Sequence, residues 1–393
     1  MFDIGLPELD ITERTVDVNN DYTYQATVRL SPSVCPECGS AHIVKHKKQD
    51  RMIRDLNEFG HRVGIVIHGH RYQCKDCGNT FGTELSCVDK SGRLTKRLIT
   101  KIQFECFGKT FKEIADVYGI SQPSVKRIFE DYVYELSKSH TPYSPQVLGI
   151  DEMYLHRQYC GIFVDVIGQK VIEMTESLNE VAVKKCLKSL PDNRKIQCVT
   201  MNMRQSYKDA VIDVLGDIPI IIDKFHIIKE LNSALDGIRR IFRKEMEKES
   251  RVALKNMRFL LLTDGESLTS RQSKQLNLLL ETYPQLQTPY HLKEAFRNIY
   301  QFAESREEAE QLYADWVQAN ADEDCHAFDG FISTVENWHK EVFNFFDNRL
   351  TSAQTESLNN VIRTVDRAGR GYTFPVLRAK ILYRHVIIEK ENS

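Results

Sequence analysis

The chain has 393 residues, which is long enough for two or three domains and a sizeable hydrophobic core. Charged residues make up 27% of the sequence and the formal net charge is −2, which predicts a water-soluble protein and excludes a globally basic one. No stretch approaches the roughly 18 consecutive apolar residues of a membrane span, and the acidic start MFDIGLPELD lacks the layout of a signal peptide. Without an export signal, the ten cysteines do not indicate a disulfide framework.

Charge is unevenly distributed in the first third of the chain. Residues 1–40 carry 2 basic and 7 acidic side chains, a net charge of −5. Residues 41–140 carry 18 basic and 12 acidic side chains, a net charge of +6. A local basic region of this kind is compatible with nucleic-acid binding, although the chain as a whole is not basic.

Four cysteines form two Cys-x-x-Cys-Gly motifs, SVCPECGSAH with Cys35 and Cys38, and YQCKDCGNTF with Cys74 and Cys77. Each tight turn directs two thiolates at one ion, and two such knuckles complete a tetrahedral site. We therefore expect structural Zn²⁺ in a zinc ribbon within residues 1–90; the alternatives are two unrelated pairs or a redox motif, which needs no second copy. The stretch HRVGIVIHGHRYQC between the motifs partly alternates apolar and polar residues as a strand does, and the 35-residue gap predicts an inserted hairpin.

The segment TFKEIADVYGISQPSVKRIFEDYV, residues 110–133, fits the helix-turn-helix pattern. Ile114 lies on the inner face of the first predicted helix, Gly119 falls in the turn, and Val125 returns to the core. The exposed face of the second helix carries donors that suit base edges and phosphates in a major groove: Gln122, Ser124, Lys126 and Arg127. The alternative is an ordinary helical hairpin. The preceding basic SGRLTKRLITK and the adjoining ribbon favour a DNA-binding domain over residues 91–140.

Predicted strands and helices alternate in the central part of the chain. An apolar run, Val147–Ile150, ends at Asp151 and Glu152. The other elements follow in order: strands over 159–166 and 170–175, a helix over 179–190, a strand over 195–202, a helix over 206–215, and a strand ending at Asp223 before a helix. Three antiparallel strands followed by helix, strand, helix and strand is the order of the ribonuclease-H-like α/β fold.

In that fold, carboxylates on the first strand, the fourth strand and a late helix hold two Mg²⁺ ions, which activate a nucleophile and stabilise the leaving oxygen of a phosphodiester. The first-strand position is Asp151, and the fourth-strand position is Asn202 in VTMNMRQSYKDAV. The third candidate is Glu356 in TSAQTESLNNVIRTVDRAGRGYTF. Helical spacing places four residues on one side of that helix: Glu356, Asn359, Asn360 and Arg363.

Between about residue 235 and residue 345 the apolar period predicts mostly helices, which fits an all-helical insertion before the last catalytic helix. We therefore expect an α/β protein with a ribonuclease-H-like DDE catalytic domain in residues 145–235 and 346–393. A helical insertion over residues 236–345 interrupts this domain, and the zinc ribbon and the helix-turn-helix precede it.

These motifs resemble the ISL-three family of bacterial insertion-sequence transposases, which carry an N-terminal zinc-binding region, a helix-turn-helix and a DDE catalytic domain. The resemblance covers nearly the whole chain and rests on the two knuckles and on GIDEMYL, VTMNMRQSYKDAV, IIDKFHIIKELNSALDGIRR and TSAQTESLNNVIRTVDRAGRGY. The stretches DKFH and TESLNN are the most specific. The resemblance implies that Asp151 is the first catalytic carboxylate and Glu356 the third, both as ligands of catalytic Mg²⁺.

The sequence departs from the family at one catalytic position, because the family's second Asp falls at Asn202. An amide oxygen binds Mg²⁺ only as a neutral ligand, so the site loses one negative charge. Asn202 is either an engineered change that traps a DNA complex or a natural feature of a transposase that binds DNA without cutting it. A third alternative is that Asp223 supplies the missing charge. The competing interpretation is that Asp223 caps the next helix and that His226 packs or contacts DNA.

Two functions of different classes follow from the resemblance. The first is a transposase that binds the double-stranded ends of its element and cuts and joins DNA with two Mg²⁺ ions; the alternative is a transposase-derived DNA-binding regulator with an inactive catalytic domain. Further candidates for DNA contact follow Glu356: Arg363, Arg367 and Arg370. The resemblance also implies a homodimer on DNA and a cytoplasmic, nucleoid-associated bacterial protein that does not contact membranes.

Overall fold

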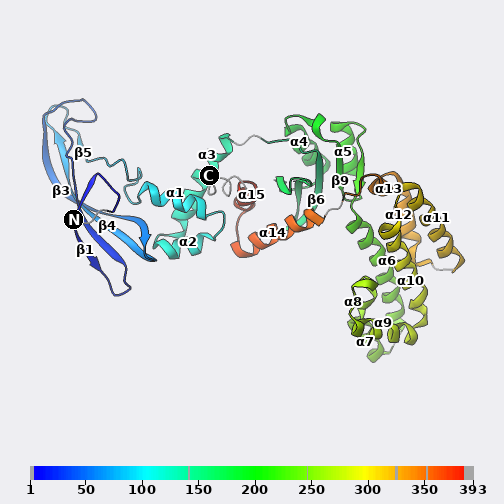
Figure 1. Cartoon of the computed structure of the whole chain (residues 1–393). Helices are drawn as coiled ribbons and strands as arrows, with labels where there is room; N and C mark the ends of the chain where they lie inside the picture. The colour runs from blue at the N-terminus through cyan, green and yellow to red at the C-terminus, as the bar shows by residue number, and fades with distance from the viewer. Residues whose placement is uncertain (1–3, 140–141, 246, 324–325, 351–352, 385–393) are drawn as a thin grey trace. The chain divides into compact units, whose positions relative to one another are not determined.

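Contacts between residues divide the chain into two compact units, whose elements are labelled in Figure 1. The computed structural model describes residues 4–139, 142–245, 247–323, 326–350 and 353–384. The terminal unit comprises Met1–His140 and Thr364–Ser393, and the central unit comprises Thr141–Arg363. Within the described residues, no helix has the length and apolar character that crossing a lipid bilayer requires.

The terminal unit contains a five-stranded sheet in the order β1–β2–β4–β3, with β5 paired to β4. Its strands are β1 (Leu9–Val16), β2 (Tyr22–Val28), β3 (Ile43–Glu58), β4 (His61–Cys74) and β5 (Thr80–Gly82). β3 and β4 form a long hairpin, and its turn residues Phe59 and Gly60 both have positive φ (49° and 84°), as a two-residue type I′ turn requires. Because this hairpin separates the two Cys-x-x-Cys motifs, the predicted insertion in the ribbon is confirmed.

Three helices follow the sheet: α1 (Lys96–Glu105), α2 (Phe111–Tyr118) and α3 (Gln122–Ser139). α2 begins with a capping box, in which the side chains of Thr110 and Glu113 each accept a hydrogen bond from the other residue's backbone N–H. It ends at Gly119, whose φ of 63° allows the left-handed conformation of the turn. Ile114 and Val125 are fully buried, so the predicted inner faces of the two helices are confirmed.

The last helix, α15 (Phe374–Leu382), packs into the core formed by α1–α3. Val376, Ala379 and Tyr383 join the apolar cluster around Ile114 and Phe129. By their contacts, the described residues from Thr364 to Arg384 therefore group with the terminal unit, whereas the sequence predicts a catalytic domain that includes residues 346–393. The physical reason is that the apolar face of α15 is buried against the helix-turn-helix core.

Lys380 of α15 is buried in this core, with 3% of its surface exposed. Its ammonium group donates hydrogen bonds to the backbone carbonyls of Cys106 and Lys109 near the end of α1. The rings of three aromatic residues lie around the same group, within 4.9–5.5 Å of it: Phe111, Phe129 and Tyr372. Burial lowers the pKa of Lys380 to about 8.

The central unit contains a second five-stranded sheet, in the order β10–β9–β6–β7–β8. Its strands are β6 (Val147–Leu155), β7 (Gln158–Asp165), β8 (Lys170–Thr175), β9 (Cys198–Met201) and β10 (Ile220–Ile222). β6, β7 and β8 are joined as antiparallel neighbours, while β9 runs parallel to β6 and β10 runs parallel to β9. Two helices lie between these strands in the chain and contact each other: α4 (Glu180–Ser189) and α5 (Gln205–Leu215).

Asp151 lies inside β6 and not at its end, which corrects the prediction of a strand over Val147–Ile150. The strand continues to Leu155 because its second half pairs with β7, with Asp151 opposite Ile162. The parallel pairing with β9 instead stops at Ile150, which is opposite Met201. Asp151 is therefore held within a hairpin, at the level where the parallel part of the sheet ends.

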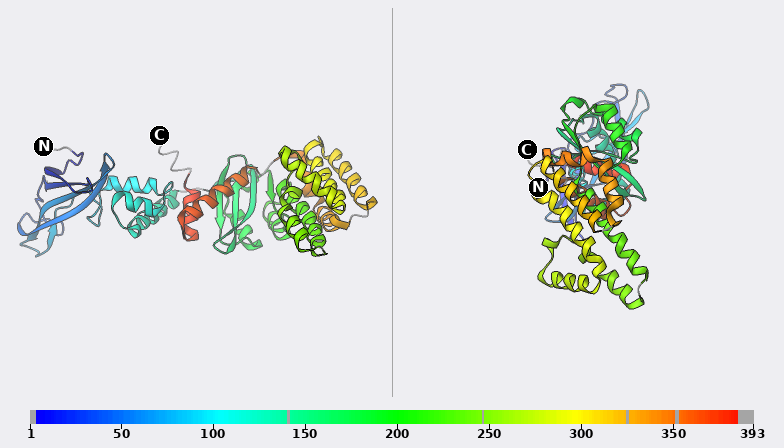
Figure 2. Two further views of the ribbon diagram at one scale, coloured as in Figure 1. Left: turned by 90° about the horizontal axis from the view of Figure 1, so that it is seen from below. Right: turned by 90° about the vertical axis from the view of Figure 1, so that its right-hand side faces the viewer.

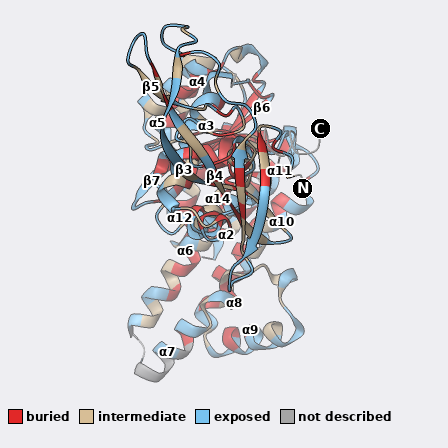
Figure 3. Cartoon of the chain, turned by 90° about the vertical axis from the view of Figure 1, so that its left-hand side faces the viewer, coloured by how far each residue is buried: buried red, intermediate tan, exposed pale blue. Residues whose placement is uncertain are grey.

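Residues 224–348 are mostly helical, as their apolar period predicts, and both views in Figure 2 show these helices gathered as one body. The helices are α6 (Lys224–Glu245), α7 (Lys248–Asn256), α8 (Arg258–Leu262), α9 (Ser270–Thr282), α10 (Gln287–Phe302), α11 (Arg306–Asp322), α12 (Asp329–Asn337) and α13 (His339–Asn348). Leu235 and Leu261 belong to a leucine-rich cluster. α9 contributes its buried leucines to this cluster, while most of its residues are exposed (Figure 3).

Aromatic rings form a second part of the helical core. Phe296 of α10 lies 5.1 Å from Trp316 and 4.8 Å from Phe331, measured between ring centroids. The body returns to the sheet through α13, whose Asn344 side chain donates a hydrogen bond of 2.8 Å to the carbonyl of Ile220 in β10. The helix α14 (Ala353–Gly369) follows. The chain therefore leaves the sheet after β10 and comes back beside that strand.

Candidate functional site

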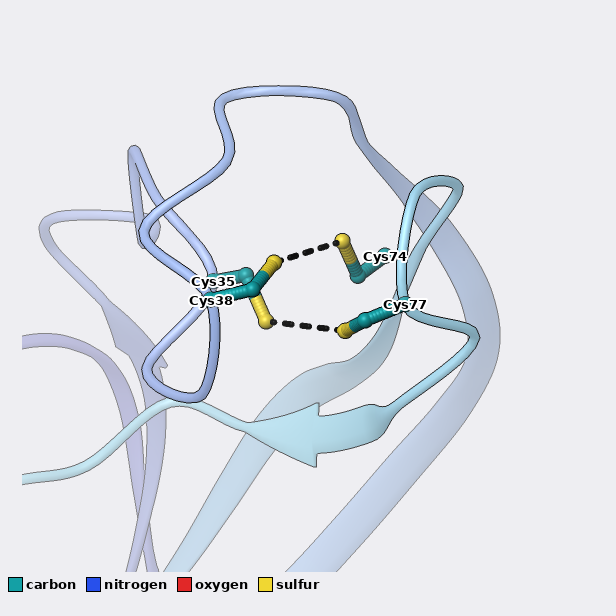
Figure 4. Close-up of side chains that lie close together, drawn as sticks. All are labelled: Cys35, Cys38, Cys74 and Cys77. Carbon is teal, nitrogen blue, oxygen red and sulfur yellow. Dashed lines mark hydrogen bonds between the residues drawn. The ribbon is translucent and has the colours of Figure 1, made fainter.

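The four cysteines of the two knuckles come together at the end of the β3–β4 hairpin (Figure 4). Cys35 and Cys74 are buried, and Cys38 and Cys77 are exposed. The sulfur atoms are 3.7 Å apart for Cys35 and Cys77 and 3.6 Å apart for Cys38 and Cys74, and all four lie within 4.8 Å of one another. The knuckles close as tight turns, because the N–H groups of Gly39 and Gly78 donate to the carbonyls of Cys35 and Cys74.

This geometry fits a tetrahedral zinc ion. Zn–S bonds of about 2.3 Å place the sulfur atoms of a tetrahedral site about 3.8 Å apart, close to the two measured pairs. The thiol protons are unevenly held in the absence of a metal ion: a hydrogen bond from the backbone N–H of Cys77 lowers the pKa of the Cys74 thiol to about 6, whereas the pKa values of the Cys38 and Cys77 thiols are raised. The cluster therefore supports a structural zinc site. Within the described residues it is also the group whose possible ligand atoms converge most clearly for a metal ion.

A cavity of about 570 Å³ opens at the edge of the central sheet, and all of its lining residues belong to the central unit. It contains the three residues that the sequence predicted for catalysis, Asp151, Asn202 and Glu356. Further polar residues line it: Glu152, Arg204, Asp223, His226, Lys229, Glu230, Thr355, Asn359 and Arg363. The structure therefore brings together residues that are more than 200 positions apart in the chain.

Three of these residues form a row across neighbouring strands. Ile150 of β6 and Ile222 of β10 both pair with Met201 of β9, which lies between them. The next residues along the three strands are Asp151, Asn202 and Asp223, so they reach the cavity at the same level of the sheet. The backbone N–H of Asp223 also donates to the Met201 carbonyl at 3.4 Å, which continues the register past β10. Neighbouring strands are about 4.8 Å apart, so two carboxylates flank one amide.

Three groups contact the Asp151 carboxylate. Its Oδ2 accepts a hydrogen bond of 2.6 Å from the Asn359 side chain of α14. Its Oδ1 accepts a 2.7 Å bond from the backbone N–H of Glu152 and lies 3.9 Å from Nε2 of His226. The other ring nitrogen of His226, Nδ1, lies 3.4 Å from Oδ2 of Asp223. The imidazole therefore lies between the two carboxylates of the row.

Asp223 also begins the helix α6. Its Oδ1 accepts a hydrogen bond of 3.0 Å from the N–H of Phe225, and its carbonyl accepts the N–H of His226. These are the contacts of an N-cap residue, so the capping role that the sequence suggested is present. Asp223 acts electrostatically on a second group, because burial and then the Asp223 charge raise the pKa of Tyr300, whose hydroxyl is fully buried.

Glu152 is directed to a different set of partners. Arg204 donates a 2.8 Å hydrogen bond to Oε1, and the hydroxyl of Tyr207 donates a 3.2 Å bond to Oε2. Burial, followed by the Glu152 charge, raises the pKa of the Tyr207 hydroxyl, which keeps it as a proton donor. Glu152 is therefore engaged in holding the start of α5 beside β6. Sequence reasoning did not predict this contact, although Arg204 and Tyr207 stand directly after the VTMN stretch.

The helix α14 contributes the last group of side chains. Glu356 is exposed at the cavity, while Thr355 and Asn359 face inward and are buried. Thr355 Oγ1 and Asn359 Oδ1 have no hydrogen-bond partner among the described residues. Arg363 lines the cavity and bonds to Asn360. Arg367 and Arg370 are exposed, belong to the terminal unit and are not among the residues that line this cavity.

The donor atoms of the cavity suit a hard divalent cation. Carboxylate, amide and hydroxyl oxygens are the ligands that Mg²⁺ prefers, and two buried oxygens on α14 lack partners. The carboxylates are, however, spread over β6, β10 and α14, and they do not converge within 4.8 Å as the cysteines do. Asn359 and His226 hold Asp151 and Asp223 in the spread arrangement. Sequence reasoning placed Asn359 beside Glu356 but missed that it contacts Asp151.

The predicted DNA-reading residues of α3 lie at its start. Gln122, Lys126 and Arg127 are exposed, and Lys126 lies 3.6 Å from Glu130 in an ion pair along the helix. Ser124 is only half-buried, and its hydroxyl is within 2.8 Å of the hydroxyl of Ser121, the cap residue that precedes the helix. Three of the four side chains therefore remain accessible, while Ser124 is partly engaged in the local structure of the turn.

Comparison with known families accounts for nearly the whole chain. A family model for the ISL3 DDE domain, described as "Transposase", matches residues 148–381. A model described as "zinc-finger of transposase IS204/IS1001/IS1096/IS1165" matches residues 31–77, and one described as "Helix-turn-helix domain of transposase family ISL3" matches residues 83–133. The three matches follow the chain order of the cysteine cluster, the helix-turn-helix and the cavity.

Two curated relatives agree with these matches. The chain is 22% identical over 346 residues to the transposase for insertion sequence element IS1001 of Bordetella parapertussis, covering 86% of this chain and 85% of the relative. It is 24% identical over 255 residues to the transposase for insertion sequence element IS1557 of Mycobacterium tuberculosis, covering 58% and 57%. Because the transposase family model alone spans more than half of the sequence, the chain belongs to the ISL3 family of transposases.

Proposed function

We propose that the chain is the DNA transposase of an insertion sequence, which binds the terminal inverted repeats of its element and catalyses strand cleavage and strand transfer. The observation that carries the proposal is the shared cavity of Asp151, Asn202 and Glu356 in a chain of the ISL3 family. The relatives named above are transposases, and the chain covers 85% of the length of one of them. Water is the first nucleophile and a DNA 3′-hydroxyl is the second.

The arrangement of the central sheet supports a ribonuclease-H-like fold with a helical insertion. Three antiparallel strands, β6–β8, come first, and β9 then lies beside β6, as that fold requires for the first two ligand positions. The helices α6–α13 lie between β10 and α14, the helix that carries Glu356. We infer that the catalytic domain comprises residues 145–235 and 346–393, and that residues 236–345 are the insertion; the family model that matches residues 148–381 supports these outer bounds.

Asp151, Glu356 and the Asn202 amide oxygen are the groups that would hold two Mg²⁺ ions in a DDE mechanism. Bound Mg²⁺ supplies Lewis-acid chemistry, which activates the attacking oxygen and stabilises the leaving oxygen of a phosphodiester. The protein's own contribution is positional: the β6–β7 hairpin holds Asp151, and the Asn359 amide fixes the orientation of its carboxylate. The Arg363 guanidinium at the same cavity is placed to contact a DNA phosphate.

The accessible side chains at the start of α3 support the proposed contact with double-stranded DNA. Gln122, Lys126 and Arg127 offer hydrogen-bond donors of the kinds that bind base edges and phosphates. We infer that the zinc ribbon and the helix-turn-helix recognise the element ends. A homodimer that pairs two ends and a cytoplasmic, nucleoid-associated location belong to the same proposal.

Asn202 favours one alternative function, a DNA-binding regulator derived from a transposase. The residue lies at the centre of the row and is 6% exposed, and none of the described residues makes a hydrogen bond to its side chain. A neutral amide at a position that the family fills with Asp removes one negative charge from a two-metal site. Loss of a direct metal ligand is expected to cost more than the 10–100-fold typical of changes to the groups that support ligands.

A cleavage assay on terminal-repeat DNA with Mg²⁺ or Mn²⁺ separates the two functions. The chain is compared with Asn202→Asp and with the double variant Asn202→Asp, Glu356→Gln, and binding of each to the same DNA is measured by gel shift. Cleavage by the chain itself supports the transposase. Cleavage by Asn202→Asp alone identifies a disabled transposase, and cleavage by neither, with tight specific binding, supports the regulator.

The double variant tests the assignment of the third carboxylate. Adding Glu356→Gln is expected to abolish the cleavage that Asn202→Asp shows, while DNA binding is unchanged because the proposed recognition residues lie on α3, which does not line this cavity. Unchanged cleavage would remove Glu356 from the proposed site.

A further inference from the structure

We propose that Asp223 supplies the second carboxylate of the metal site, in the place that Asn202 leaves neutral. The inference rests on the proposed function, because it concerns a metal ligand for that same reaction. The observations that carry it are the register of the sheet, the contacts of Asp223 and the position of His226.

The register places Asp223 beside Asn202 on the side away from Asp151. β6 and β10 both run parallel to β9. The last residue of each that pairs with β9 is Ile150 in β6 and Ile222 in β10, and both lie opposite Met201. The positions that follow therefore emerge together at the same edge of the sheet and line one cavity. A carboxylate on β10 is one strand spacing, about 4.8 Å, from the position that the amide on β9 occupies.

The capping contact uses only one oxygen of Asp223. Oδ1 accepts the Phe225 N–H at 3.0 Å, whereas Oδ2 faces Nδ1 of His226 at 3.4 Å. An ordinary helix cap needs a polar oxygen but no charge, and it needs no second partner in a cavity. The side chain of Asp223 is only 12% exposed, so its charge is held close to the row and is not dispersed in solvent.

His226 connects this carboxylate to the first ligand. Its two ring nitrogens lie 3.4 Å from Asp223 and 3.9 Å from Asp151, with the ring 19% exposed. The imidazole therefore separates the two carboxylates, which line the same cavity on either side of Asn202. A divalent cation bound beside the Asn202 amide would be attracted by the Asp223 charge in addition to that of Asp151, which offsets the charge missing at Asn202.

The experiment separates charge from capping by the substitution Asp223→Asn, because Asn caps helices about as well as Asp. Mn²⁺ alone is the probe, and its binding to the full chain with the zinc site filled is measured by titration calorimetry. Asp151→Asn is the positive control. Asp217→Asn is the matched negative control, since Asp217 precedes the same strand, is 89% exposed and is not among the residues that line the cavity.

We expect Asp223→Asn to weaken Mn²⁺ binding by at least about tenfold, as Asp151→Asn does, with an unchanged melting temperature. Asp217→Asn is expected to bind as the parent chain does. In the Asn202→Asp background, Asp223→Asn should cost clearly less, because the new carboxylate makes that of Asp223 redundant. A second readout is backbone cleavage by bound Fe²⁺ and ascorbate, which should cut near residues 151 and 223 in the parent chain.

Three results would overturn the inference, and they are distinguishable. If Asp223→Asn binds Mn²⁺ as the parent does while Asp151→Asn does not, Asp223 is only a helix cap and the proposed function stands. If Asp151→Asn also binds as the parent does, the metal site itself is absent and the proposed cleavage activity fails with the inference. Equal costs of Asp223→Asn in both backgrounds would show that Asp223 does not replace the missing ligand.

Discussion

The cysteine cluster and the acidic cavity are two candidate metal sites built in opposite ways. The four thiols come from two short turns at the end of one hairpin, and their sulfur atoms already lie within 4.8 Å of one another. The cavity collects its oxygens from three neighbouring strands and a helix, and Asn359 and His226 contact its carboxylates and keep them apart. A site formed by local turns is complete once those turns close, whereas a site formed by distant elements depends on the packing of the whole unit.

The largest expected effect comes from a substitution in the cysteine cluster. Cys35→Ser removes one of four thiolates, and binding of structural zinc contributes roughly 10–16 kcal/mol to the folding of such sites. We expect loss of the bound zinc and of the fold of residues 31–82, measured by zinc release to a chromogenic chelator and by hydrogen exchange. Cys87→Ser is the control, because Cys87 lies outside the cluster. Retained zinc in Cys35→Ser would contradict the four-thiolate site.

The second prediction asks whether the terminal unit depends on local contacts alone. Lys380→Ala removes a buried side chain that joins α15 to α1 across more than 270 residues of sequence. We expect a loss of about 2–5 kcal/mol in the stability of the helical core, because a cavity forms under three aromatic rings and two carbonyls lose a donor. The measurement is the rate of labelling of the buried thiol of Cys106, which should rise. An unchanged rate would show that α15 contributes little to this core.

Lys380 also predicts a pH dependence of the same unit. The pKa of Lys380 is about 8 in the folded chain, against an ordinary value of 10.5. Below pH 8 both states carry the proton, and the cost of burying the charge is present in full. Between pH 8 and 10.5 the unfolded state holds more protons than the folded state, so stability rises with pH, by up to about 3 kcal/mol from this group.

The measurement is urea denaturation of the chain and of Lys380→Met at several pH values, followed by circular dichroism. The difference in unfolding free energy between the two proteins should increase in favour of the parent chain from pH 8 to pH 10.5 and then level off. A difference that is independent of pH would mean that the folded lysine keeps its ordinary pKa.

The fourth prediction concerns the acidic cavity and tests a residue that orients one of its proposed metal ligands. Asn359→Ala removes the donor that orients the Asp151 carboxylate, and loss of such a partner typically weakens metal binding by about 10–100-fold. Mn²⁺ binding should fall in that range, while Asn360→Ala, one position along α14, should have little effect. Equal behaviour of the two variants would show that the contact between α14 and β6 does not matter for the site.

The smallest expected effect concerns the capping role of Asp223. Asp223→Ala removes the acceptor of the Phe225 N–H and should destabilise the central unit by about 1 kcal/mol, whereas Asp223→Asn should be neutral in stability. The measurement is thermal unfolding without added divalent metal, followed by the fluorescence of Trp316 and Trp338, which both lie in that unit. If Asp223→Asn is as unstable as Asp223→Ala, the charge itself contributes to the fold.

Much of the fold could be predicted because its signals are local. The Cys-x-x-Cys-Gly turns, the capping box at Thr110 and the glycine at position 119 each act within a few residues. The strands of the central sheet were predicted with small errors at their ends. The clearest error was to end the first strand at Ile150. The pairing of β6 with β9 stops at that residue, but its pairing with β7 continues to Leu155, and no local sequence pattern indicates this continued pairing.

By itself, then, the sequence determined the zinc ribbon, the helix-turn-helix and the family, and it predicted three catalytic positions that the structure places in one cavity. Only the tertiary structure decided that Asp223 stands level with Asn202, that His226 lies between two carboxylates, that Asn359 orients Asp151 and that α15 belongs with the helix-turn-helix. The physical reason is the range of the interactions. Turn and cap geometry depends on neighbouring residues, whereas strand register and helix packing join residues tens to hundreds of positions apart.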